Sequence, residues 1–136
     1  ESLTGSDWNK ICDWEDWTVG VTARHVGAGH FAISKMAAMI VKGKDLPPLS
    51  MDQINAMSEK DSRKHSDCTK AEALELLRKN SAELAAFASG LTDDELDRKG
   101  SMPAFGGEVT TEQLLDFIIF QSAAQHFDSM RAAVGK

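Results

Sequence analysis

The chain has 136 residues, 42% of them apolar and 26% charged, which is enough to bury one hydrophobic core in a single domain spanning residues 1–136. Its formal net charge of −6 and its lack of lysine or arginine runs argue against a nucleic-acid partner, because phosphate-binding surfaces need clustered cations. No stretch approaches the roughly 20 apolar residues of a membrane span, and the two isolated cysteines favour free thiols in a cytoplasmic protein.

The sequence predicts a long helix over residues 18–41. Thr18 is a favoured N-cap residue, because its side chain can accept a hydrogen bond from an unpaired backbone N–H in the first helical turn. Gly43 and the two prolines at 47 and 48 end this helix, since proline cannot continue one.

Three more helices are expected to begin at capping boxes, in which two side chains three residues apart satisfy backbone donors that would otherwise be unpaired. The boxes are Ser50 with Gln53, Thr69 with Glu72, and Thr110 with Gln113. The second of these helices is expected to end at Gly90, and the third to reach Ala133.

Two short motifs, residues 3–8 and 91–96, share a Leu-Thr start, and each predicts a short helical turn. Each motif is followed by a loop and then by a long helix that begins at Thr18 or Thr110, so the chain looks like two copies of one unit. A long helix over residues 69–89 precedes the second motif, and the corresponding helix before the first motif is missing from this sequence.

These elements predict an all-α fold, namely an antiparallel four-helix bundle whose first helix is missing or supplied by a partner. A bundle that lacks one member leaves an apolar helix face open to solvent. We therefore expect a homodimer, in which a neighbouring subunit covers that face through an apolar interface.

Two of the four histidines, His25 and His126, fall on the inward faces of different long helices. Gly27 and Gly29 are expected to leave space beside the His25 imidazole. In a bundle interior two such rings could converge on zinc, nickel or iron. The alternative is that each is an ordinary core histidine, bonded to a backbone carbonyl or a serine. His30 lies about 140° around the helix from His25 and is not expected to share its site.

The remaining polar and aromatic candidates have simpler expected roles. The tryptophans near the start of the chain are expected to pack: Trp8, Trp14 and Trp17. Glu15 and Asp16 are expected to interact with the dipole of the helix that begins at Thr18, and His65 to be solvated near the end of the shorter helix.

Several short motifs together resemble the DinB-like superfamily. They are Trp17-Thr18-Val19 followed by His25, then Asn55, Gly90-Leu91-Thr92, and His126 with Arg131-Ala132-Ala133. More narrowly, they resemble the metal-binding domain of the mycothiol-dependent maleylpyruvate isomerase group, over nearly all of the chain. The resemblance implies a four-helix bundle, often dimeric, whose first helix lies before the Leu-Thr turn.

The resemblance also implies a divalent metal site, with zinc or nickel as the expected ion. The family's histidine on the second helix corresponds to His25, and the last ligand on the fourth helix corresponds to His126. The remaining ligand, usually glutamate or histidine, corresponds to Ser122. Serine is a poor ligand for a transition metal, because its hydroxyl is neutral and weakly basic.

Two functions remain open from the sequence. The first is a metal-dependent transferase or isomerase, in which an ion held by His25 and His126 activates a low-molecular-weight thiol or a water molecule. The second is a degenerate, non-catalytic bundle that binds a ligand or a protein partner and keeps the histidines as packed remnants. The two inward histidines favour the first function, and Ser122 favours the second.

Overall fold

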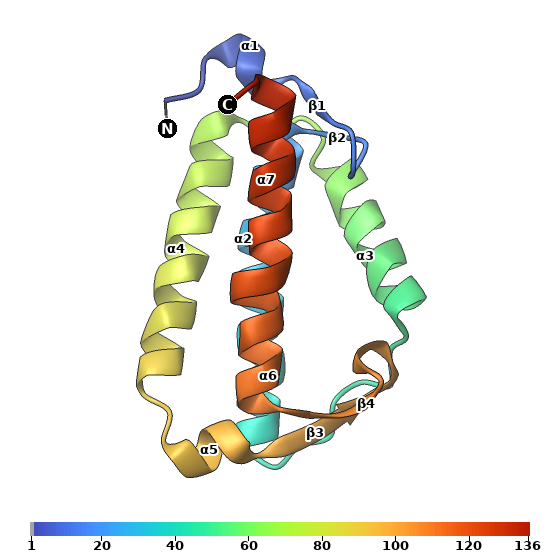
Figure 1. Cartoon of the computed structure of the whole chain (residues 1–136), viewed down its shortest axis with the longest axis vertical. Coiled ribbons are helices and arrows are strands. Elements are labelled where there is room, and N and C mark those ends of the chain that lie inside the picture. The colour runs from blue at the N-terminus through green and yellow to red at the C-terminus, as the bar shows by residue number, and fades with distance from the viewer. Residues whose placement is uncertain (1) are drawn as a thin grey trace.

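The computed structural model describes residues 2–136, and four helical columns dominate it (Figure 1). The columns are α2 (Val19–Val41), α3 (Met51–Lys64), α4 (Lys70–Ser89) and a continuous C-terminal column made of α6 (Thr111–Asp116), η2 (Phe117–Ser122) and α7 (Ala123–Val134). Successive columns run in opposite directions (Figure 1). The predicted antiparallel helical fold is confirmed, and two short β-hairpins accompany the helices.

The predicted helix starts form as the capping motifs require. The Thr18 hydroxyl accepts a hydrogen bond from the Val21 amide at the start of α2. All three predicted boxes are complete. In each, the cap side chain accepts a hydrogen bond from the backbone N–H of the residue three positions later, and the side chain of that residue accepts one from the backbone N–H of the cap. These bonds join residues within one helical turn, which is why the local sequence alone predicts them.

The predicted repeat is visible as two copies of a short helix, a β-hairpin and a long helix. The first copy contains α1 (Gly5–Trp8), β1 (Ile11–Cys12) and β2 (Trp17–Thr18) before α2. The second contains α5 (Asp93–Asp97), β3 (Lys99–Met102), η1 (Pro103–Phe105) and β4 (Gly107–Thr110) before α6. The expected loops are therefore antiparallel hairpins, whose strands of two to four residues are too short to show an alternating pattern.

The same backbone hydrogen bond closes both copies of the unit. The Val19 amide donates to the Lys10 carbonyl, and the Thr111 amide donates to the Arg98 carbonyl, both at 2.9 Å. In each case the first residue of the long helix is tied to the residue just before the hairpin. The hairpin thereby sets the direction in which the long helix leaves it.

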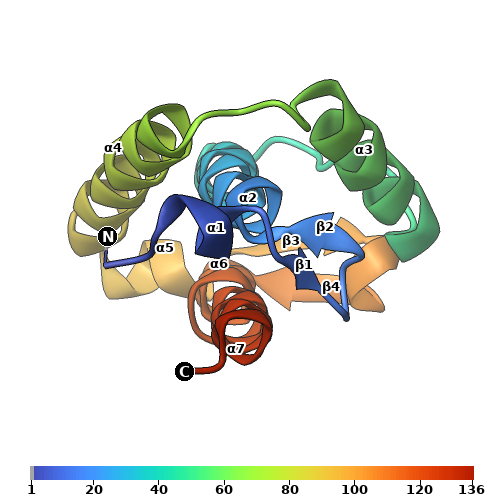
Figure 2. The ribbon, with the colours of Figure 1, turned by 90° about the horizontal axis from the view of Figure 1, so that it is seen from above.

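Figure 2 shows α2 at the centre, with α3 and α4 on opposite sides of it and the C-terminal column across from it. Gly27 allows α2 and α4 to approach closely, because a Cβ at this position would lie 3.0 Å from the Leu77 Cα. The Asn80 amide of α4 also donates a 2.9 Å hydrogen bond to the Gly27 carbonyl. The expectation that Gly27 leaves space beside His25 is therefore wrong, since it faces α4 instead.

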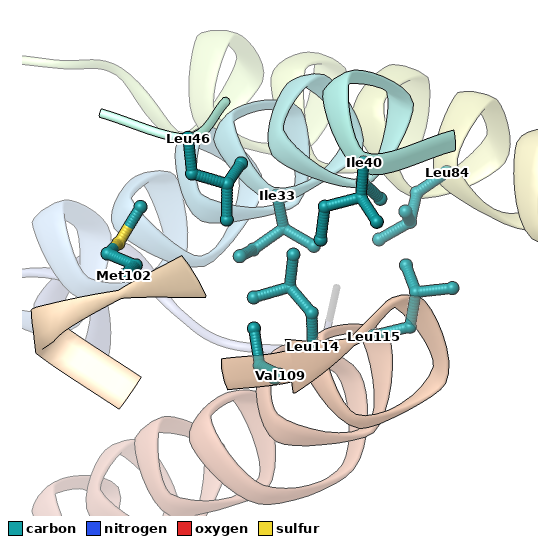
Figure 3. Packing of buried hydrophobic residues seen from close by; sticks show 9 residues of the cluster. Ile33, Ile40, Leu46, Leu84, Met102, Val109, Leu114 and Leu115 are labelled. Atoms are coloured by element: carbon teal, nitrogen blue, oxygen red, sulfur yellow. The ribbon is translucent and has the colours of Figure 1, made fainter. Parts of the chain in front are cut away.

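Two apolar clusters lie along α2. The larger one joins its C-terminal half to the second hairpin and α6, and Figure 3 shows its packing around Ile33 and Ile40. The smaller one contains Cys12, Val19, Ala23 and Met130 near the first hairpin. His25 and His30 lie on α2 between the portions that enter these clusters.

The helices formed by residues 2–136 include none with the length and hydropathy of a segment that spans a bilayer. The additional helix expected before Leu3 and the homodimer expected to cover an open face stay predictions.

Candidate metal and ligand site

A cavity of about 620 Å³ lies between α2, α3 and the C-terminal column, next to the hairpin of β1 and β2. Side chains from all of these elements line it, including His25 from α2 and His126 from α7. The sequence interpretation that these two histidines face inward and converge agrees with this arrangement. The same cavity is lined by Gly29, which adds no side chain to fill it.

The imidazoles of His25 and His126 meet edge to face, with 4.9 Å between ring centroids and 77° between ring planes. Each ring also contacts a tryptophan from the first hairpin. Trp17 lies 5.0 Å from His25, and Trp14 lies 5.3 Å from His126, between centroids. Trp14 is 63% exposed, so it lies against His126 at the surface rather than packing in the core.

Glu15 holds the His126 ring in place. Its carboxylate lies 2.7 Å from the His126 Nδ1 and accepts a 2.5 Å hydrogen bond from the Ser129 hydroxyl. The Glu15 side chain is only 3% exposed. A carboxylate oxygen accepts hydrogen bonds, so the His126 Nδ1 is the donor in this contact and Nε2 takes no part in it.

The role expected of Glu15 at the helix dipole is therefore wrong. The hairpin turn directs its side chain to α7 and away from the start of α2. Asp16 next to it adopts a left-handed backbone conformation with φ of 58°, which makes the tight turn possible. The contact spans 111 positions of sequence, and only the placement of the acidic residue between two tryptophans hints at it.

His25 is neutral in the folded protein at pH 7. Its pKa is lowered from 6.5 to about 4, mainly by burial and next by the charge of the neighbouring His126, with Asp61 and Glu15 acting in the opposite direction. A neutral imidazole carries a free lone pair on one ring nitrogen. The convergence of the two rings and the neutral state of His25 therefore suit nitrogen ligation of a cation.

His30 lines the same cavity, although its ring turns toward α4. Its Nδ1 lies 2.9 Å from the Ser81 hydroxyl, while its buried Nε2 has no hydrogen-bond partner among the described residues. Burial lowers the pKa of His30, so this ring is also neutral near pH 7. His30 was not expected to share a site with His25. The two rings do make different contacts, but both residues line the same cavity.

Ser122 lies on the cavity wall, four residues before His126. It ends η2, a π-helical segment that the sequence analysis did not predict and that interrupts the α-helical register of the column just before His126. Such segments are frequent at functional sites. Residues 2–136 contain no group of three or more histidine, cysteine or acidic side chains that could hold a metal ion.

The other candidate groups lie outside this arrangement. His65 caps the C-terminal end of α3, where its Nδ1 is 2.9 Å from the Asp61 carbonyl oxygen. Cys12 and Cys68 are free, and burial raises the pKa of both thiols. Protonated thiols are weak nucleophiles, so neither cysteine carries the chemistry of the site.

Comparison with known proteins bears on the same region. The profile of the DinB superfamily matches residues 1–126, which include every residue that lines the cavity. The chain belongs to the DinB superfamily. No curated protein and no solved structure matches it. Membership of the DinB superfamily agrees with the broader of the two resemblances seen in the sequence, and the narrower one, to the mycothiol-dependent group, stays a prediction.

Proposed function

We propose that this DinB-superfamily chain binds a divalent metal ion, zinc or nickel, through His25 and His126. The observation that carries the proposal is the meeting of two imidazoles from separate helices, 4.9 Å apart between centroids, with Glu15 orienting one of them. Imidazole nitrogen is a good ligand for both ions. Because His25 is already neutral at pH 7, binding displaces no proton from it.

The donor set fits an open site rather than a closed structural one. Two imidazoles leave further coordination positions to water or substrate, and the neutral hydroxyl of Ser122, which the resemblance matches to a third ligand, lines the same cavity. A carboxylate hydrogen-bonded to the far nitrogen of a metal-binding histidine, as Glu15 is to His126, raises the donor strength of the ring.

The proposed activity is a thiol-dependent transfer or isomerisation with a low-molecular-weight thiol as co-substrate. A divalent ion supplies Lewis acidity, which lowers the pKa of a coordinated thiol or water. The chain's own residues orient and shield the reacting group. Glu15 fixes the His126 ring, and Trp14 and Trp17 each pack against one of the two imidazoles.

A second function, that of a non-catalytic ligand-binding module, is favoured by one specific observation. No third histidine, cysteine or acidic side chain within residues 2–136 completes the set, and Ser122, which the family resemblance matches to a stronger ligand, is a poor one. In that case the cavity binds its ligand without a metal, and the two histidines act as hydrogen-bonding groups.

Metal analysis of untagged protein separates the two functions. We expect about one zinc or nickel ion per chain, lost in His25→Ala and in His126→Ala and retained in the matched control His65→Ala, whose ring lies outside the cavity. Ser122→Glu should raise the metal affinity by roughly tenfold or more, because it adds an anionic ligand one helical turn from His126. A metal-free protein whose Ser122→Glu variant also binds no ion would leave only the second function.

We also propose that a second copy of the chain covers the exposed face of the C-terminal column. Phe120 and Phe127 are 70% and 37% exposed on the C-terminal column, and Ala124 between them in sequence is also exposed. We expect a dimer in sedimentation equilibrium that dissociates in Phe120→Glu. Phe31→Glu, at an exposed phenylalanine of α2, should leave the dimer intact.

A further inference from the structure

The α2 wall of the cavity changes from polar to apolar along its length. The lining residues of α2 begin with His25 and end with Ile33 and Met36, the last of which lies about 16 Å further along the helix axis. Ile33 belongs to the larger apolar cluster, and Met36 packs against that cluster. The wall is therefore polar at the N-terminal end of α2 and apolar toward its C-terminal end.

The α3 wall shows the same change in the opposite sequence order. Its lining residues start with Met51 and Ile54 in the first turn and then become polar: Asn55, Ser58 and Glu59. α3 runs antiparallel to α2 (Figure 1). The Trp17 Nε1, whose ring contacts His25, donates a 2.9 Å hydrogen bond to the Glu59 carboxylate. The polar part of α3 therefore lies at the His25 end of the cavity.

The C-terminal column repeats the pattern on a third wall. Phe117 and Ile118 come first, and the later lining residues include three polar ones: Ser122, Gln125 and His126. The contact between the His25 and His126 rings places the polar part at the His25 end. Phe117 lies at the other end, where its ring packs edge to face on Phe105 of η1 with 5.5 Å between centroids.

The apolar end is also closed by backbone contact between two elements. The Ala104 amide of η1 donates a 2.9 Å hydrogen bond to the Leu49 carbonyl, just before α3 begins. Three antiparallel walls thus agree on one polar end and one apolar end. In small-molecule sites the apolar surface supplies most of the affinity, and a few convergent polar groups fix the orientation of the ligand. The volume of about 620 Å³ is in the usual range for such sites.

We propose that the cavity binds a linear, amphiphilic small molecule, with its polar head group at the histidines and its apolar tail between Met36, Ile54 and Phe105. This deepens the proposed function and rests on it in one respect, because it takes the histidine end as the place of the reacting group. The molecule on which the thiol chemistry acts then carries its reactive group at the end of an apolar tail.

Binding of uncharged alcohols to the full chain tests the role of the tail, with EDTA present so that no metal takes part. Butan-1-ol, hexan-1-ol and octan-1-ol share one head group and differ only in the length of the tail. The dissociation constant measured by protein-observed NMR should fall roughly tenfold for every two added methylene groups, because each methylene leaves water for an apolar wall.

Two diols of the same composition test the orientation. Hexane-1,2-diol carries both hydroxyls at one end, whereas hexane-1,6-diol carries one at each end. The 1,6-diol should bind roughly tenfold more weakly, because its second hydroxyl lies in the apolar end without a hydrogen-bond partner. With hexan-1-ol, NMR shifts are expected at the methyl groups of Met36 and Met51 and at the Trp17 indole N–H, which line the cavity. The methyl group of Met130, in the smaller apolar cluster, is the internal reference.

A matched pair of variants ties the binding to the wall. Met51 and Met57 are 36% and 59% exposed on α3, and only Met51 lines the cavity. Met51→Gln should weaken hexan-1-ol binding severalfold, and Met57→Gln should leave it unchanged.

The proposal would be overturned by affinities that do not rise with tail length, by equal binding of the two diols, or by equal effects of the two variants. A chain that holds no metal but binds the alcohols as expected would remove the metal site and leave this proposal standing. A chain that holds zinc or nickel but binds none of the alcohols would do the reverse.

Discussion

The partly buried imidazole of His25 should make the free energy of unfolding depend on pH in a way that can be measured directly. Its pKa is lowered from 6.5 to about 4 in the folded protein. Between these values the unfolded chain binds a proton at this position and the folded chain does not. The stabilising contribution is therefore fully present above pH 6.5 and is lost as the pH falls toward 4.

The size of the effect follows from the two pKa values. At about pH 5 the imidazole is almost fully protonated in the unfolded chain and mostly neutral in the folded one. The free energy of unfolding is therefore roughly 2 kcal/mol lower than at about pH 7.5. This pH lies above the ordinary pKa values of the carboxylates, so few of them titrate in the same interval. His30 changes stability in the same direction, because its pKa is also lowered by burial.

The assay compares urea unfolding of the unmodified chain and of His25→Gln in EDTA, at the two pH values. The glutamine variant keeps a polar side chain and cannot titrate, so the difference between the two proteins isolates His25. On acidification, the free energy of unfolding of the unmodified chain should fall by roughly 2 kcal/mol more than that of the variant. Equal losses in the two proteins would refute the burial of a neutral imidazole at this position, and so would a larger loss in the variant.

Three further predictions concern single contacts. Gly27→Ala should lower the free energy of unfolding by about 1–3 kcal/mol, because the new Cβ would meet the backbone of Leu77. Gly29→Ala should raise the free energy of unfolding by up to about 1 kcal/mol, because there is open space at this position. The same urea titration measures both variants. Glu15→Ala should weaken metal binding by about 10–100-fold in a chelator competition, and an unchanged affinity would contradict the orienting role of the carboxylate. Asn80→Ala should cost about 1–3 kcal/mol in thermal or urea unfolding, since it leaves the buried Gly27 carbonyl without its partner, and a neutral effect would mean that water replaces the amide.

The helices and their starting points could be predicted from the sequence. The capping boxes at Ser50, Thr69 and Thr110 join residues three positions apart, so the information for each lies within one helical turn. The repeated Leu-Thr motifs predicted the repeated unit for the same reason. The inward positions of His25 and His126 also followed from helical periodicity, because periodicity assigns a face to every residue of a helix.

The contacts that make the site depend on how separate elements pack. Gly27 and Gly29 look equivalent in sequence, yet α4 lies against one and the cavity against the other. Glu15 reaches His126 only because the first hairpin lies beside α7, 111 positions later in the chain. The sequence alone determined which segments are helical and which faces are apolar. Tertiary structure decided which side chains meet, because the free energy of packing depends on the shapes of all the elements at once.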